Sequence, residues 1–491
     1  MSTHKVLFVT SEASPLIKTG GLADVCGALP AALRESGLDV RLLLPGYRDL
    51  DTNTGQLERV ATLDLKTPAV RVEILAGETE NKVPFWLIEY PPAFDRPGNP
   101  YLDRWGIPWS DNAARFSLLA RVAVEIAQDR AALNWRPDLV HCHDWQAGLV
   151  PALLSVEPRH PATVFTIHNL SYQGRFDRAT FDALHLPSTW WSADALEFYG
   201  DMSFIKGGLV FADTLTTVSP SYAKEIQTPA YGCGLEGLLS HRASDLHGIL
   251  NGIDDQVWDP AHDKLIAKPY DCNRLAAKAV NKRALLREVG LPEQKDTPLA
   301  GMIGRLVPQK GIDLAMEAMT MLSDVPMQWV ILGSGFAEYE QALRELAARE
   351  PNRIAVHLGY AESLAHRIEA GADLFVMPSR YEPCGLNQMY SLRYGTVPIV
   401  HRVGGMADTV VDATPQNLSA ETATGFVFNE PSALALARAI RRAASLYSDQ
   451  KRWTTLMRTA MVQDFSWQAS AARYQHLYEQ VCGAMAKVPA A

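Results

Sequence analysis

Short apolar runs rich in β-branched and aromatic residues alternate along the chain with longer segments of helical periodicity. In the first half, the strand-like runs are KVLFVTS, DVRLLLPG, PFWLIEY, PDLVHCH, ATVFTIHN and TLTTVSP. Helical spacing between them is clearest in residues 112–133, NAARFSLLARVAVEIAQDRAAL. This alternation predicts parallel sheets whose strands are joined by crossover helices.

The pattern changes once, after residues 248–270, and restarts at LAGMIGRLV beyond the polar stretch PEQKDTP. It continues through QWVILGSG, RIAVHLGY, DLFVMPS, TVPIVHR and TGFVFNE. Because 491 residues exceed a single hydrophobic core, we expect two α/β domains that meet near residues 250–265. Doubly wound domains bind ligands beyond the carboxyl ends of their strands, so two such edges facing each other would form a deep cleft.

Charge and composition narrow the class of protein. Forty-six basic and 55 acidic residues give a net charge of −9, which argues against a nucleic-acid binder. No segment is apolar enough for a membrane helix, and the N-terminal apolar run is too short for a signal peptide. The six cysteines form no C-x-x-C pair, so we expect reduced thiols and a cytoplasmic protein. The sequence predicts no oligomeric state.

A lysine and a glycine pair follow the first strand-like run, in KTGGLADV. Lys18, Gly20 and Gly21 precede a predicted helix, whose N-terminal backbone amides favour an anion. Taken alone, a solvated lysine in a flexible loop explains the stretch equally well.

The second half repeats this arrangement in GRLVPQKG. Arg305 ends a strand-like run, and Lys310 stands just before a glycine and a helix. Two cations at this spacing can hold a diphosphate, the arginine through two hydrogen bonds and the lysine as a point charge. An ordinary surface pair is the alternative.

A carboxylate and another glycine pair complete the candidates of the second half. Glu382, in SRYEPCGLNQMY, is expected directly after a strand, with Pro383 in the first position of a helix. It would either cap that helix or bind sugar hydroxyls and oppose positive charge at a reacting carbon. Gly404 and Gly405 precede another helix start.

Histidines and an aspartate stand at two strand ends of the first half, in HCHDWQAG and TIHNLSYQG. The residues are His141, His143, Asp144, His168 and Asn169. The first three could be considered as metal ligands, but no further cluster of Cys, His or acidic residues completes a site. We therefore expect no metal and no cofactor.

Two nucleotide-binding motifs are incomplete or missing. GSGFAE, residues 333–338, begins like G-x-G-x-x-G but ends in Glu338. The phosphate-binding motif G-x-x-x-x-G-K-[ST] does not occur.

Taken together and in this order, KTGGLADV, HDW, TIHN, NGID, GRLVPQKG and SRYEPCGLNQMY resemble bacterial glycogen synthases and plant starch synthases. The resemblance extends from Lys5 to about Tyr478. It implies the two-domain glycosyltransferase fold called GT-B, with a glucan-side domain over 1–255 and a nucleotide-sugar domain over 256–465. A C-terminal helix over 466–491 would cross back to the first domain. The implied reaction transfers glucose from ADP-glucose to the non-reducing 4-hydroxyl of an α-1,4-glucan with retention of configuration and release of ADP.

The resemblance also implies roles for individual residues. Lys18 would contact the donor phosphates, and Gly20 and Gly21 would bring backbone amides close to them. Arg305 and Lys310 would hold the diphosphate of the departing ADP.

Further roles concern the sugar and the base. His168 would lie against the donor glucose, Asp144 near the glucose or the acceptor, and Tyr360 against the adenine. Glu382 would bind glucose hydroxyls. The other implied substrate-binding residues are Asn169, Asn251, Cys384, Gly404 and Gly405.

The retaining mechanism has two routes, and the sequence leaves both open. Glu382 could act as a covalent nucleophile, or the acceptor could attack from the side that the diphosphate leaves. Many retaining members of the wider superfamily carry a second glutamate eight residues after the first, where this chain has Tyr390.

Three other functions compete with this interpretation: a GT-B transferase that uses UDP-glucose or makes a small product such as sucrose, a glycan-binding protein with an inactive site, and a nicotinamide-dependent oxidoreductase. Agreement of the motifs over the full length argues against the first, and a comparison of the two donors would separate it. Intact Lys18, Arg305, Lys310 and Glu382 argue against the second, and the incomplete fingerprint GSGFAE argues against the third.

Overall fold

The computed structural model describes residues 4–50 and 57–485, which form two α/β units. Unit 1 comprises Met1–Gly252 and Trp467–Ala491, and unit 2 comprises Ile253–Ser466. The predicted domain limits, 1–255, 256–465 and 466–491, lie within three residues of these; positions 1–3, 51–56 and 486–491 lie outside the described residues.

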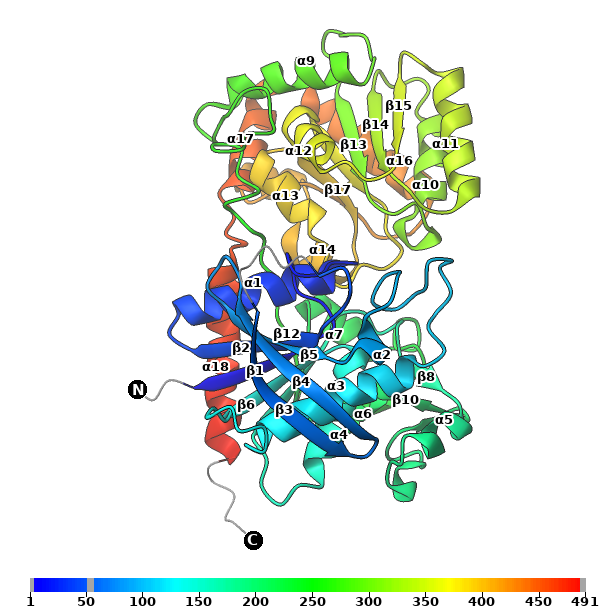
Figure 1. Ribbon diagram of the computed structural model, residues 1–491. Helices are drawn as coiled ribbons and strands as arrows, with labels where there is room; N and C mark the ends of the chain where they lie inside the picture. The colour runs from blue at the N-terminus through cyan, green and yellow to red at the C-terminus, as the bar shows by residue number, and fades with distance from the viewer. Residues whose placement is uncertain (1–3, 51–56, 486–491) are drawn as a thin grey trace. The chain divides into compact units, whose positions relative to one another are not determined.

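Unit 1 is built around a nine-stranded sheet. Its parallel part carries the six strand-like runs recognised in the sequence, and helices connect them (Figure 1). In sheet order the strands are β12 (Leu246–Gly248), β11 (Thr214–Thr217), β7 (Ala162–Ile167), β6 (Leu139–His143), β1 (Lys5–Val9), β2 (Asp39–Pro45), β5 (Pro84–Glu89), β4 (Ala69–Glu78) and β3 (Glu58–Lys66). The helices are α1 (Gly21–Glu35), α2 (Pro91–Phe94), α3 (Asn112–Ala127), α4 (Leu149–Ser155), α5 (Arg178–Ala183), α6 (Phe204–Phe211), α7 (Pro220–Glu225), α8 (Glu236–His241) and α18 (Trp467–Met485).

Two parts of unit 1 were not predicted from the sequence. The first is the antiparallel edge, where β4 pairs with both β3 and β5. The second is a small sheet of β8 (Arg175–Phe176), β10 (Asp201–Ser203) and β9 (Glu197–Phe198). The short strands of this sheet have too few residues to display a period of two, so pattern analysis does not detect them.

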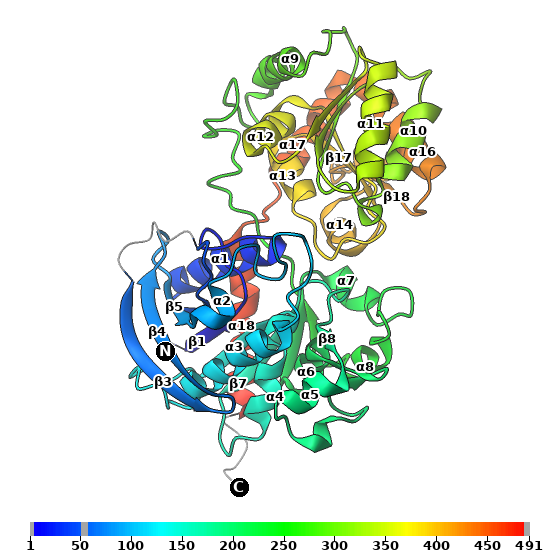
Figure 2. The ribbon, with the colours of Figure 1, turned by 45° about the vertical axis from the view of Figure 1, so that its right-hand side comes forward.

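Unit 2 is a three-layer α/β domain with a fully parallel sheet. Helices α9, α12 and α13 cover one face, and α10, α11 and α16 cover the other (Figures 1 and 2). In sheet order the strands are β15 (Ile354–Leu358), β14 (Gln328–Gly333), β13 (Leu299–Ile303), β16 (Leu374–Met377), β17 (Val397–His401) and β18 (Phe426–Phe428). The helices are α9 (Lys278–Glu288), α10 (Ile312–Met321), α11 (Ala337–Arg349), α12 (Glu362–Gly371), α13 (Asn387–Tyr394), α14 (Gly404–Thr409), α15 (Pro415–Ser419), α16 (Ala433–Tyr447) and α17 (Gln450–Met461). The two doubly wound α/β domains predicted from the sequence are confirmed.

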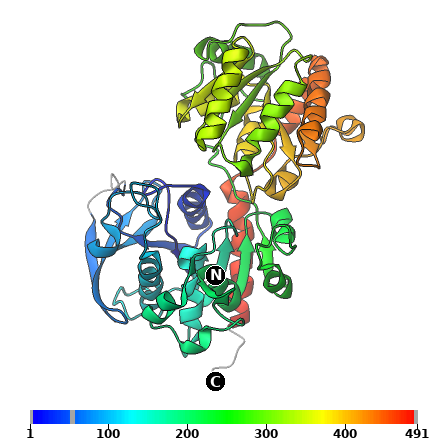
Figure 3. The same cartoon turned by 90° about the vertical axis from the view of Figure 1, so that its right-hand side faces the viewer.

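Helix α18 returns the C-terminal part of the chain to unit 1 (Figure 3, red). It packs along α1, and Trp467, Tyr474 and Tyr478 are part of the same buried apolar cluster as the residues of β1. The Tyr478 hydroxyl lies 2.7 Å from Nδ1 of His141 in β6. Because this helix fills the core next to the strands that carry candidate residues, its loss would expose that core.

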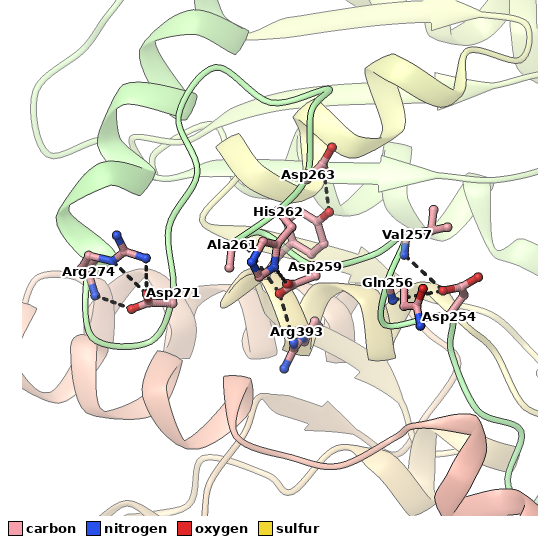
Figure 4. Close-up of polar contacts among 11 residues, drawn as sticks. Asp254, Gln256, Val257, Asp259, Ala261, His262, Asp263, Asp271, Arg274 and Arg393 are labelled. Carbon is pink, nitrogen blue, oxygen red and sulfur yellow. Dashed lines mark hydrogen bonds and ion pairs between the residues drawn. The ribbon is translucent and has the colours of Figure 1, made fainter. Parts of the chain in front are cut away.

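The first residues of unit 2 form an irregular segment, 253–274, organised by aspartates (Figure 4). Asp254 accepts the backbone N–H groups of Gln256 and Val257, and Asp259 pairs with Arg393 of α13 at 3.0 Å. The almost fully buried Asp263 bonds Nδ1 of His366 at 2.8 Å. Local aspartate turns explain why the periodicity of the sequence is lost here.

Candidate functional site

In each unit, two of the candidate residues follow the strands at which the strand order reverses: Lys18 and Asp144 in unit 1, and Lys310 and Glu382 in unit 2. In unit 1 the chain leaves the neighbouring strands β1 and β6 toward opposite edges of the sheet, and in unit 2 it does the same from β13 and β16. At such a switch point the connecting segments separate and leave room for a ligand beyond the carboxyl ends of the strands. Both switch points are therefore candidate binding sites.

The loop that contains Lys18 follows β1 and leads directly into α1. Gly20 precedes the first residue of α1 in an extended conformation, and as a glycine it has no side chain to cap the helix. Lys18 is half exposed, and its Nζ lies 2.6 Å from Oδ1 of Asp24. A Cβ added to Gly20 or Gly21 would meet no described protein atom within 4 Å. Packing within the protein thus does not require these glycines.

A buried acid that the sequence analysis did not single out fixes this loop. Glu12 is 2% exposed, and it accepts hydrogen bonds from the backbone N–H of Thr19 and from the Thr19 hydroxyl, the latter at 2.7 Å. The hydroxyl of Tyr101 donates to the same carboxylate. An acid at the end of an apolar strand was the available signal, because an acid in such a place needs buried partners.

Asp144 follows β6 and binds the residues that follow β7. Its Oδ1 accepts the backbone N–H of His168 at 2.7 Å and, at 3.4 Å, that of Asn169. Its φ of 55° is unusual for a non-glycine residue, which is typical of functional sites. Burial raises the pKa of Asp144 to about 7, and the charge of Glu12 adds to this, against the lowering effect of the two N–H groups. This carboxyl can therefore exchange a proton near neutral pH.

Three buried histidines, His141, His143 and His168, lie next to one another beside Asp144. His143 Nδ1 lies 3.0 Å from His168 Nε2, and burial lowers the pKa of His168 to about 3. Burial also holds the pKa values of His141 and His143 well below their usual range. His168 is therefore neutral, so it can orient a hydroxyl without adding charge.

Both ring nitrogens of His141 already contact hydroxyl groups, so His141 is not available as a metal ligand. Its Nδ1 and Nε2 contact the hydroxyls of Tyr478 and Thr166, at 2.7 and 2.5 Å. Within residues 4–50 and 57–485, no group of three His, Cys, Asp or Glu side chains is arranged to hold a metal ion. His141 therefore serves the interior of unit 1.

In unit 2, a lysine and a glutamate from neighbouring strands meet at the switch point. Lys310 follows β13 and Glu382 follows β16, and Nζ lies 2.5 Å from Oε2. Ser379 donates a hydrogen bond to the same oxygen at 3.0 Å. Arg305 is exposed, and its side chain donates a 3.4 Å hydrogen bond to Oε1 of Gln309. Two cations and a carboxylate thus stand at one edge of the sheet.

The predicted position of Glu382 relative to the next helix was wrong. Strand β16 ends at Met377 and α13 begins at Asn387, with Leu386 as the preceding residue, so Pro383 is not in the helix. The intervening residues form a loop, and Glu382 bonds to Lys310 and Ser379 within it. Because α13 begins well beyond Glu382, the helix-capping alternative does not hold.

The glycine pair at the start of α14 lets this helix approach the loop that carries Glu382. A Cβ on Gly404 would lie 1.8 Å from the carbonyl oxygen of Glu382, and one on Gly405 would lie 2.2 Å from that of Cys384. Gly404 also has a φ of 45°. These glycines are thus needed for packing, in contrast to those before α1.

The remaining candidates lie at other strand ends. Tyr360 follows β15 and is 85% exposed, and Cys384 is buried. Asn251, after β12, is buried, and its Oδ1 has no hydrogen-bond partner among the described residues. Tyr390 stacks on Trp258 with ring centroids 4.0 Å apart, so an aromatic contact occupies the position of the second glutamate.

The candidates divide between the two units, and direct contacts join Asp144 to His168 and Asn169 in unit 1 and Lys310 to Glu382 in unit 2. In unit 1 the candidates are Lys18, Gly20, Gly21, Asp144, His168, Asn169 and Asn251. In unit 2 they are Arg305, Lys310, Tyr360, Glu382, Cys384, Gly404 and Gly405.

Comparisons with known proteins cover nearly the whole chain. Residues 5–241 match the model of the starch synthase catalytic domain, and residues 287–458 match that of glycosyl transferases group 1. Glycogen synthase 1 of Methylococcus capsulatus is 53% identical over 98% of this chain and 97% of its own length. Glycogen synthase 2 of Nitrosococcus oceani is 54% identical over 97% of each chain.

Solved structures agree with these matches. The catalytic domain of Starch Synthase IV from Arabidopsis thaliana, bound to ADP and acarbose, has a TM-score of 0.88 and 31% identity, with 98% of this chain and 100% of that chain covered. Sucrose-phosphate synthase from Thermosynechococcus elongatus has a TM-score of 0.59 and 18% identity over 98% of this chain and 100% of its own, a likeness of fold alone.

Proposed function

This chain belongs to the starch and glycogen synthase family of GT-B glycosyltransferases, and from that premise we propose which of its residues carry out the reaction. The enzyme transfers glucose from ADP-glucose to the non-reducing 4-hydroxyl of an α-1,4-glucan, retains the α configuration and releases ADP. The observation that carries the assignment of residues is the Lys310–Glu382 pair, with Arg305, at the switch point of unit 2.

The positive side chains stabilise the leaving group. Cleavage of the bond between glucose and phosphate leaves a diphosphate whose negative charge grows in the transition state, and stabilising such charge is usually an enzyme's largest contribution. Arg305 and Lys310 supply two cations in unit 2, and Lys18 supplies a third together with the uncapped amides at the start of α1. The reaction then needs no metal ion, and we assign it no cofactor.

Residues of unit 1 orient the sugar and the acceptor. His168 is held through Nε2 by His143 and through its backbone N–H by Asp144, so its ring has a fixed direction. A neutral imidazole can contact a sugar hydroxyl without opposing the positive charge that develops on the reacting carbon. Asn169 and Asn251 add amide groups for further hydroxyls, and the carboxyl of Asp144 lies near the glucose or the acceptor.

Glu382 binds the glucose and balances charge in our assignment. A carboxylate oxygen 2.5 Å from an ammonium group shares its electrons with that cation, which makes it a weaker nucleophile. This favours attack by the acceptor from the side that the diphosphate leaves over a covalent intermediate on Glu382. Mass-spectrometric trapping of a glucosyl group on Glu382 would contradict this assignment.

The ligand classes follow from the same family. The starch synthase relative was bound to ADP and acarbose, so we propose nucleotide and glucan-type ligands here. Tyr360 follows β15 with a largely exposed ring that is available to stack on adenine. No helix in the described part of the chain is long and apolar enough to cross a membrane. Within the described residues no two cysteines form a disulfide, and we propose a cytoplasmic location.

The first experiment compares two donors. Incorporation of labelled glucose into glycogen is measured with ADP-glucose and with UDP-glucose at equal concentration, with EDTA and without added metal. Transfer from ADP-glucose alone supports the donor, the reaction and metal independence. Preference for UDP-glucose overturns the donor assignment, and transfer that requires a divalent ion overturns the metal-free mechanism. Absence of transfer from either donor favours the glycan-binding alternative.

A further inference from the structure

The loop from His168 to Gly174 is fixed at both ends by two consecutive residues. Asp144 accepts the backbone N–H of His168 at its start. At its end, Gly174 lies against the ring of Trp145, where an added Cβ would be 2.3 Å from a ring carbon. The φ of Gly174 is 59°, so this position favours glycine both for its conformation and for its contact.

The ring of Trp145 packs in a cluster of aromatic side chains. Its ring centroid lies 4.9 Å from that of Phe116, 6.0 Å from that of Phe176 and 6.3 Å from that of Phe204. Closely packed rings adopt few alternative positions, so the end of the loop is held on a rigid base.

Between these two anchors the loop projects Tyr172 outward. The backbone N–H of Tyr172 donates to the carbonyl of Asn169 at 3.2 Å. The backbone N–H of Ser171 donates to Oδ1 of the same asparagine at 3.1 Å. Tyr172 is 53% exposed although its backbone is fixed. The backbone that carries this ring is thus fixed before any ligand binds, which lowers the entropic cost of ordering the loop.

A second exposed tyrosine lies on the adjoining loops. Gln173 donates from Nε2 to the carbonyl of Cys233 at 3.0 Å, which ties the Tyr172 loop to residues 228–235. The ring of Tyr199 lies over the neighbouring Gly234, and Tyr199 is 76% exposed. We call Tyr172 and Tyr199, with residues 169–174 and 228–235, the tyrosine platform.

The tyrosine platform contains no charged side chain in either loop. Residues 169–174 are NLSYQG and residues 228–235 are TPAYGCGL, whereas 21% of the whole chain is charged. The two loops offer rings, amides and hydroxyls, and the Arg175–Asp201 ion pair lies beside them with its charges balanced. Such a surface suits a neutral polyhydroxyl ligand better than a phosphate or a nucleic acid.

We propose that the tyrosine platform binds the α-1,4-glucan acceptor, with glucose rings placed on Tyr172 and Tyr199 through their apolar C–H faces. The proposal rests on the proposed function, because the platform continues the loop that carries His168 and Asn169. A glucan that extends from the reacting end would cover this surface, and tyrosine rings give large contact area at low entropic cost. The platform then determines affinity for long acceptors and leaves donor binding unchanged.

The test measures glucan binding and transfer separately. Tyr172→Ala, Tyr199→Ala and the double variant are compared with the wild type by affinity electrophoresis in glycogen-containing gels, without donor. Each single variant should raise the Kd for glycogen about tenfold, as expected when roughly 50 Å² of apolar contact is lost. KM for glycogen should rise in parallel, whereas KM for ADP-glucose and kcat with saturating maltotriose should stay within about twofold of wild type.

Two kinds of control sharpen the result. Tyr172→Phe and Tyr199→Phe keep the rings and should bind like the wild type, and circular dichroism verifies that each variant is folded. Trp105→Ala removes a 72% exposed aromatic side chain elsewhere on unit 1 and should leave the Kd unchanged. An unchanged Kd in the double variant, or an equal loss in Trp105→Ala, overturns the proposal. A wild type that binds glycogen through these tyrosines but transfers no glucose would instead contradict the proposed function alone.

Discussion

Lys310 and Glu382 are 72 residues apart in the sequence, and their charged groups lie 2.5 Å apart in the structure. The contact exists because the strands that precede them, β13 and β16, are neighbours at the point where the order of the sheet reverses. Both side chains are mostly buried, at 26% and 9% exposure, so each one reduces the cost of burying the other's charge. The pair therefore keeps both charges in place for the reaction.

Replacement of Lys310 by alanine should lower kcat about 100- to 1,000-fold, because it removes a cation that stabilises charge developing on the diphosphate. Affinity for glycogen should change little. Steady-state kinetics with ADP-glucose, combined with glycogen-gel electrophoresis, separates the two effects. Arg441→Ala removes an exposed cation that pairs with Asp324 in the same unit, and serves as the control. If Lys310→Ala turns over like Arg441→Ala, Lys310 does not take part in catalysis.

Glu382→Gln and Glu382→Ala should each reduce transfer by at least about 100-fold without unfolding the protein. The helix that follows begins five residues later, so removal of this carboxylate leaves the start of α13 intact. Circular dichroism and thermal unfolding should resemble those of the wild type within a few degrees. A collapsed far-ultraviolet spectrum would mean that Glu382 is a structural residue.

The two glycine pairs should respond in opposite ways to alanine. At Gly20 the added Cβ meets no described protein atom within 4 Å, so Gly20→Ala should keep the stability within about 1 kcal/mol. If phosphates approach this backbone, kcat/KM for ADP-glucose should still fall about 10- to 100-fold.

At Gly404 the same substitution creates a 1.8 Å contact at a φ of 45°. Gly404→Ala should lower the free energy of unfolding by about 1–3 kcal/mol. Urea denaturation and kinetics of both variants test this contrast. Unchanged kinetics in Gly20→Ala would remove the phosphate role from the Lys18 loop.

The sequence predicts those features of the structure that neighbouring residues determine, and it does not predict those that depend on contacts between distant residues. Strands such as β1 and β14 are short, and all their residues after the first polar one are apolar or glycine, so their pattern suffices. Strand β3 alternates weakly on an exposed edge, and its pairing depends on β4. The loop between β16 and α13 was mistaken for a helix start because proline, here Pro383, is common in the first position of helices. Contacts with Lys310 and α14 shape this loop instead.

The candidate site shows the same division. Glycines and basic residues at strand ends are local signals, so Lys18, Arg305 and Lys310 could be proposed as candidates from the sequence. Glu12 was missed because its importance comes from Thr19 and Tyr101, which reach it only in the folded chain. The elevated pKa of Asp144 likewise arises from burial, which no motif records.

That pKa makes the stability of unit 1 depend on pH in a defined direction. The folded state raises the pKa of Asp144 from 3.8 to about 7, so folded protein binds this proton more tightly than unfolded protein. Below about pH 4, Asp144 therefore leaves the free energy of unfolding unchanged. As pH rises from about 4 to about 7, Asp144 lowers the free energy of unfolding progressively, by up to about 4 kcal/mol. The buried histidines act oppositely: their lowered pKa values cost stability as pH falls below about 6.5.

Asp144→Asn isolates the aspartate, because asparagine can still accept the N–H of His168 but carries no proton to lose. The urea midpoint of the variant, relative to wild type, should be higher at pH 8 than at pH 5, while the histidine contribution cancels in the comparison. Activity of the variant at pH 7 should fall if the carboxyl contacts the sugar. An equal difference between the two midpoints at both pH values would show that Asp144 titrates well below pH 5, fully ionised despite its burial.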